Sequence, residues 1–138
     1  MNFGRVAVSA VVAWFAYLLL SPLVNAVLLA ELYAAHGAVF RPQGEMNLVL
    51  GLGVQLIGFF VFAYAYAKGY EGGHGALEGL RFGVVVGLLL SCFAVTWNYV
   101  VLPVSGALGV AWVVDMMVEM AIYGVVVGLI YRPIAGRK

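Results

Sequence analysis

The sequence predicts an all-helical integral membrane protein, an antiparallel bundle of four transmembrane helices. Hydrophobic residues make up 65% of the 138 residues and charged residues only 9%, against roughly 45–50% and about 25% in soluble domains. The apolar residues gather in four runs, each near the roughly 20 residues that a helix needs to cross a bilayer. We therefore expect a single transmembrane domain over residues 1–138, with lipid as its solvent.

The first apolar run, about residues 6–35, is longer than one crossing requires. It also exceeds the roughly 7–15 residues of a secretory signal core, so we expect a retained helix. Pro22 lies within this run and removes a backbone donor, which predicts a long, proline-kinked first helix. The other runs cover about residues 46–68, 77–101 and 107–131. The connectors are too short to fold separately, so we expect the protein to act in the membrane or at its surface.

The positions of Lys and Arg predict the orientation of the helices. In a four-span arrangement, Arg41 alone lies on one side, and all the other basic residues lie on the opposite side. These are Arg5, Lys68, Arg81, Arg132, Arg137 and Lys138. The asymmetry predicts a cell inner-membrane protein with both termini in the cytoplasm. Trp97 and Trp112 then fall near the outer interface, where aromatic side chains are enriched.

Glycines recur at four-residue spacing in the last two runs. They are Gly79, Gly83 and Gly87 in the third run, and Gly124 and Gly128 in the fourth. Glycines at such spacing let membrane helices approach closely, so we expect these two helices to pack through a glycine zipper, with a homodimer seam as the alternative. At about 100° per residue, the glycine face of the fourth helix lies roughly opposite Asp115 and Glu119. This helix should therefore be central in its bundle or lie at a subunit interface.

Two carboxylates, Asp115 and Glu119, lie one turn apart on the same face of the fourth run. A charge at the bilayer centre costs about 2.5–3.5 kcal/mol on insertion scales, and no Lys or Arg of the chain lies at similar depth. Three explanations are open: the acids are protonated, they hold a cation from solvent, or they pair with a basic residue of another chain. The first two suit proton- or cation-linked transport of a small solute. The third suits an accessory subunit of a larger complex, and two neutral acids hydrogen-bonded to neighbouring helices remain the purely structural alternative.

Three further polar residues lie at compatible depths and are candidates to line a cavity with these acids. They are Asn98, Gln55 and Asn25. Each of them alone is typical of hydrogen bonding between helices. Because 138 residues are too few to enclose a broad pathway, we expect a homo-oligomer or a complex with other membrane subunits.

Other polar residues give weaker signals. His36 and His74 fall on opposite sides of the membrane, which disfavours a shared haem or metal site, and we expect both to be solvated loop residues. Glu78 and Arg81, three residues apart, predict a local ion pair. Cys92 is the only cysteine, so an internal disulfide is excluded.

Several classes of function are disfavoured. A net charge of +1 argues against a nucleic-acid partner. No arrangement of nucleophile and base suggests an enzyme, and we predict no cofactor and no metal.

Short motifs are distributed along most of the chain. They are "SPL" at residues 21–23, "EGLRFGVVVGLL" at 78–89, "NY" at 98–99, and an acid at Asp115 followed by "GVVVG". In these motifs the sequence resembles an uncharacterised family of small four-helix bacterial membrane proteins, a domain of unknown function. Glu119 and the aromatic positions before "SPL" depart from that pattern. The resemblance implies the four-helix fold and implies no activity.

Overall fold

The computed structural model of the protein describes residues 1–131, of which 85% are helical, with no strand among them. Four helical segments are long and apolar enough to cross a membrane. They are Phe3–Leu28, Leu48–Gly69, Gly75–Val101 and Gly106–Tyr131. The prediction of an all-helical chain with four such segments is confirmed. Three of the basic residues used to predict the orientation, Arg132, Arg137 and Lys138, lie outside the described residues.

The first segment becomes irregular directly after Pro22. The helix α1 (Phe3–Leu23) includes this proline, which cannot donate a hydrogen bond to the preceding turn. A widened, π-helical turn, η1 (Val24–Leu28), follows at once. The chain then resumes as the short helix α2 (Ala30–Ala34). At the position where the sequence predicts a kink, the backbone hydrogen bonding therefore changes from α-helical to π-helical.

The remaining elements follow in chain order. They are η2 (Gly37–Val39), η3 (Gln43–Glu45), α3 (Leu48–Gly69), α4 (Gly75–Leu90), η4 (Ser91–Val95), α5 (Thr96–Val101) and α6 (Gly106–Tyr131). The segment η4 is a second π-helical turn. The hydroxyl of Thr96 donates to the carbonyl oxygen of Ser91 at 2.8 Å, five residues back, and so provides a side-chain donor at the widened turn.

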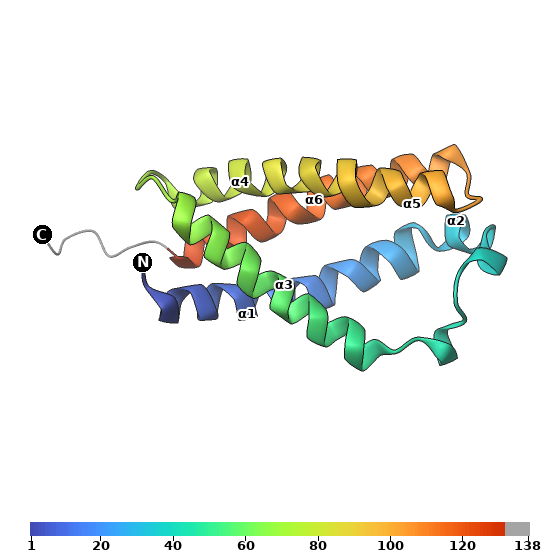
Figure 1. The fold of residues 1–138 in the computed structure, drawn as a ribbon, viewed down its shortest axis with the longest axis horizontal. Helices are drawn as coiled ribbons and strands as arrows, with labels where there is room; N and C mark the ends of the chain where they lie inside the picture. Colours follow the sequence, from blue (N-terminus) through green and yellow to red (C-terminus); the bar gives the residue numbers. More distant parts are fainter. Residues whose placement is uncertain (132–138) are drawn as a thin grey trace, which may run out of the picture.

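The helix α6 is the central element of the described chain. It packs against α4 on one side and against α1 and α3 on the other, and its end lies near the start of α1 (Figure 1). Tyr123, Val127 and Tyr131 supply its part of the core. The other helices contribute Val6, Ala10 and Ala13 of α1, and Phe59, Ala63 and Tyr66 of α3. The small side chains of α1 allow close approach to α6, as is usual between membrane helices.

The α4–α6 contact is made through glycine. Gly79, Gly83 and Gly87 are all buried. A Cβ atom at Gly79 would overlap the carbonyl oxygen of Gly124, and one at Gly83 would overlap that of Met120. The two backbones therefore touch directly, which no larger residue would permit.

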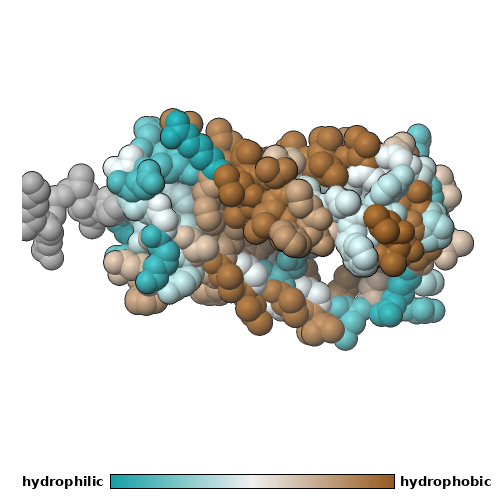
Figure 2. Space-filling view, turned by 45° about the horizontal axis from the view of Figure 1, so that its top comes forward, coloured by the Kyte–Doolittle hydropathy of each residue, from teal (hydrophilic) through white to brown (hydrophobic). Residues whose placement is uncertain are grey.

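The first half of α3 stands apart from the other helices. Within residues 48–58, only Leu56 is even partly buried, and a Cβ atom at Gly51, Gly53 or Gly58 would meet nothing within 4 Å. The space-filling view shows a gap beside this half of α3 (Figure 2). It also shows that the middle of the molecule is apolar and lies between two more hydrophilic ends. In a bilayer, lipid or another helix would cover this surface.

Candidate functional site

Glu119 is the only buried charged side chain among residues 1–131, with 8% of its surface exposed. The hydroxyl of Tyr123, one turn further along α6, donates to its Oε2 at 2.8 Å. Its Oε1 is buried and has no hydrogen-bond partner within the described chain. Tyr123 is held in turn by edge-to-face contacts with Phe59 at 5.1 Å and Tyr17 at 6.4 Å. The carboxylate thus accepts one hydrogen bond, and the tyrosine that donates it packs against aromatic rings from α1 and α3.

Asp115 lies one turn before Glu119 and is half-buried. Its carboxylate accepts no hydrogen bond from residues 1–131, and no ion pair to Lys, Arg or His is found in that range. The pKa of the nearby Tyr33 hydroxyl is raised, mainly by burial. The hydrogen bond from Trp112 lowers this pKa, and the negative charge of Asp115 raises it further. Asp115 therefore lies within electrostatic reach of α2, on the side of α6 that faces the first segment.

A chain of hydrogen bonds crosses from α6 to α1 beside Asp115. The indole Nε1 of Trp112 donates to the Tyr33 hydroxyl at 2.8 Å, and this hydroxyl donates to Oδ1 of Asn25 at 2.9 Å. The Asn25 amide donates to the carbonyl oxygen of Ser21 at 2.9 Å. The widened turn after Pro22 carries Asn25, so the irregular backbone helps to position this polar link.

The polar groups form a line along the face of α6 that contacts α1 and α2, and this line ends at Tyr123. The line begins at Trp112 and Tyr33 and continues through Asp115 to Glu119. Beyond Tyr123, towards the other end of the molecule, the buried residues of the α1–α6 contact are almost all apolar. They include Val127 of α6 and Val6 and Ala10 of α1.

Three polar residues were expected near the two acids because of their predicted depth in the membrane. The structure places only one of them there. Asn25 joins the hydrogen-bond chain described above. Asn98 is exposed on α5, and its side chain makes no hydrogen bond within residues 1–131. Gln55 is exposed on the splayed half of α3, where it lines a pocket of about 330 Å³ that includes neither Asp115 nor Glu119. Of the three candidates, only Asn25 lies beside the acids.

Sequence reasoning did not single out Tyr33 or connect it with Trp112. These two residues lie 79 positions apart, so no local spacing signals their contact. The only hint is a tyrosine that follows a proline-interrupted helix. Their meeting depends on how the chain turns after η1.

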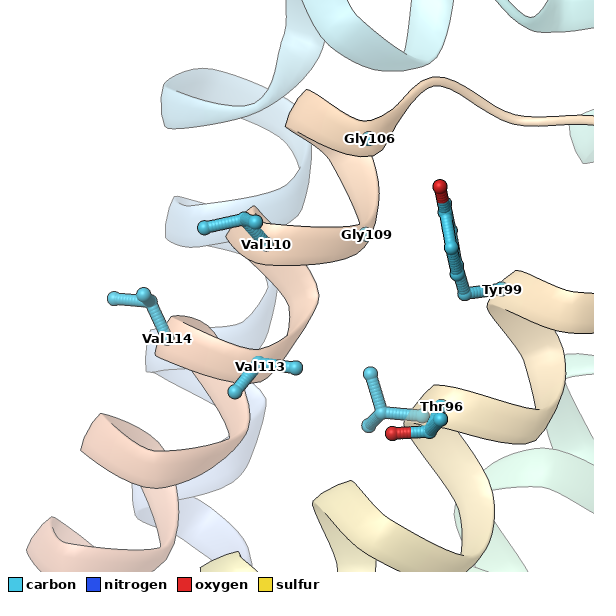
Figure 3. A pocket seen from close by; sticks show the side chains of 8 residues that line it. Thr96, Tyr99, Gly106, Gly109, Val110, Val113 and Val114 are labelled. Carbon is cyan, nitrogen blue, oxygen red and sulfur yellow. The ribbon is translucent and has the colours of Figure 1, made fainter.

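A second pocket, of about 350 Å³, lies between α5 and α6 (Figure 3). The ring of Tyr99 stands over Gly106 and Gly109, and a Cβ atom at Gly109 would come within 2.6 Å of that ring. Apart from Thr96, Tyr99 and the two glycines, the labelled residues are valines. The pocket contains no carboxylate or basic group, so it offers packing space rather than chemistry.

Two expectations about polar residues outside the site hold only in part or fail. His74 is exposed directly before α4, as expected. His36 lies in a turn but is only partly exposed: its Nε2 accepts the backbone N–H of Ser105 at 3.0 Å, and its Nδ1 lies 2.7 Å from the carbonyl oxygen of Leu32. The neutral ring with its proton on Nδ1 satisfies both contacts. Glu78 does not pair with Arg81, because its Oε1 instead accepts the backbone N–H of Gly73.

Within the described residues, no group of three His, Cys, Asp or Glu side chains is arranged to hold a metal ion. Comparison with known proteins gave no match: no family model, no curated protein and no solved structure matches the chain. Function is therefore inferred from the geometry of Glu119, Asp115 and the groups around them.

Proposed function

We propose that this is a multi-pass inner-membrane protein that links proton or cation movement to the transport of a small solute, with Asp115 and Glu119 as the exchange site. In this arrangement the four segments cross the bilayer in alternating directions, and both termini are cytoplasmic. The hydrophilic ends and apolar middle of the surface support insertion (Figure 2). The helix termini that carry Arg5 and Lys68 lie at one end of the molecule, which supports the orientation (Figure 1).

The observation that carries the proposal is the environment of Glu119. An ionised carboxylate that is buried without a countercharge is strongly unfavourable, even with one hydrogen bond. Tyr123 occupies Oε2 and leaves Oε1 without a protein partner. A proton or a cation taken from solvent would offset that charge, and its release would restore the cost. Such a group is suited to reversible loading.

The polar line ends at Tyr123, and the buried residues that follow it are almost all apolar. Transport therefore requires a second arrangement in which this apolar packing opens. The helix α3 is the element best placed to move, because its first half makes little contact with the other helices and its second half supplies Phe59 against Tyr123. A shift of α3 would loosen the aromatic packing around Tyr123, whose hydroxyl donates to Glu119.

The test is proton flux in proteoliposomes. We expect the wild-type protein to dissipate an imposed pH gradient in the presence of its ion or solute, and the double variant Asp115→Asn with Glu119→Gln to behave as empty liposomes. Glu31→Gln is the matched control, because it removes an exposed carboxylate from α2 near the Tyr33 end of the polar line. Unchanged flux in the double variant would exclude the proposal.

The alternative is a non-catalytic accessory subunit that packs on other membrane proteins. The exposed first half of α3, with glycines at positions 51, 53 and 58, favours it, because small residues allow a partner helix to approach closely. Native mass spectrometry of protein extracted gently from its own membrane separates the two functions. We expect a homo-oligomer without other chains; a stable complex with a different subunit, together with absent flux, would favour the alternative.

A further inference from the structure

Two adjoining hollows lie between α3 and α4, and neither is lined by Asp115 or Glu119. The first is the apolar pocket of about 330 Å³ that includes Phe62 and Val86. The second, of about 280 Å³, lies where α3 ends and α4 begins, and it holds charged residues. Phe82 lines both hollows, and its ring packs on that of Phe62 at 4.9 Å. Together they form one groove with an apolar length and a charged mouth.

The charged mouth contains groups of both signs. Arg81 and Glu71 are exposed and line it, together with the partly buried Glu78. Oε1 of Glu78 accepts the backbone N–H of Gly73, while its Oε2 has no hydrogen-bond partner within residues 1–131. Arg81 forms no ion pair in that range. A guanidinium and two carboxylates are therefore left without partners of opposite charge at one end of an apolar groove.

We infer that this groove binds one phospholipid with a primary-amine headgroup: the phosphate at Arg81, the ammonium near Glu71 and Glu78, and an acyl chain along Phe82 and Val86. Arginine is well suited to phosphate oxygens, and an ammonium donates to carboxylates. From Arg81 to Leu90, the last α4 residue of the groove, the helix rises by about 13 Å, enough to hold much of an acyl chain. The inference depends on membrane insertion and uses neither Asp115 nor Glu119.

The charge pattern selects among headgroups. A quaternary choline nitrogen has no N–H to donate, so it loses the hydrogen bonds to the carboxylates. A glycerol headgroup leaves the lipid anionic, so Glu71 and Glu78 would repel it. An ethanolamine headgroup satisfies both signs, with its phosphate at Arg81 and its ammonium at the two carboxylates.

The test is native mass spectrometry of delipidated, detergent-solubilised protein titrated with dioleoyl phosphatidylethanolamine, phosphatidylcholine or phosphatidylglycerol. We expect one molecule of the ethanolamine lipid to bind about tenfold more tightly than the other two, which corresponds to one charge-assisted interaction. Arg81→Gln should weaken its binding about tenfold. Lys68→Gln is the control, because Lys68 lies at the same end with its ammonium 5.7 Å from the Tyr64 ring centroid and does not line the groove.

Two further variants separate the headgroup from the chain. Glu71→Gln should abolish the preference for ethanolamine over glycerol headgroups. Ala65→Trp fills the apolar length from an exposed position on α3 and should displace all three lipids. Equal binding of the three lipids to the wild-type protein, or an equal loss in Lys68→Gln and Arg81→Gln, would overturn the inference. Neither result would bear on flux through Asp115 and Glu119, so the two proposals fail separately.

Discussion

Replacing Gly83 by alanine is expected to destabilise the protein by about 3 kcal/mol or more, although alanine is the better helix former. A Cβ atom at Gly83 would overlap the backbone carbonyl of Met120, and a carbonyl in a helix cannot rotate away as a side chain can. The two helices must separate, which removes dispersion contacts along the whole α4–α6 seam. Thermal or steric-trapping unfolding in detergent should show a large loss, or failure to accumulate folded protein.

The same substitution elsewhere provides a graded control. Gly53→Ala adds an identical methyl group to α3 where nothing lies within 4 Å, so it should be neutral or stabilising by up to about 1 kcal/mol. Gly87→Ala is intermediate, because its nearest neighbours are Cα of Met117 and Cβ of Met120, both at 3.2 Å. Equal losses at all three positions would mean that glycine at these sites does not act through close helix contact.

The helical segments could be predicted because bilayer thickness sets their length and lipid requires their apolar composition. The glycine face of α4 could also be predicted, since residues spaced four apart lie on the same side of a helix. In both cases the signal lies within one segment. Neither prediction depends on where another helix is placed.

The polar environment of the acids could be predicted only in part. Gln55 and Asn98 were grouped with Asp115 by their predicted depth in the membrane. That depth does not determine how a helix is rotated about its axis, or whether it tilts away from the other helices. The splay of α3 carries Gln55 to the surface. The contact between Tyr33 and Trp112 depends on the irregular backbone of η1, and hydrophobic periodicity describes only regular helices.

Glu119→Gln alone is expected to reduce proton-coupled flux to the level of empty liposomes, whereas Asp115→Asn should reduce it only about fivefold. Glutamine keeps the shape of the side chain and can still accept from Tyr123, but it carries no exchangeable acid proton. Asp115 is half-buried, so its attraction for an incoming cation is about 1 kcal/mol, which corresponds to that factor in rate. Initial rates measured at matched protein content and orientation distinguish the two roles.

Infrared spectroscopy tests the same assignment without transport. If the cargo is a proton, loaded wild-type protein should show the carbonyl stretch of a protonated carboxylic acid, and Glu119→Gln should remove that band. Tyr123→Phe should move it to higher frequency, because the hydroxyl that donates to Oε2 is lost. If the cargo is a cation, the carboxylate stretch of Glu119 should respond to that cation instead. A spectrum that Glu119→Gln leaves unchanged under both conditions, with flux intact, would place the exchanging group elsewhere in the chain.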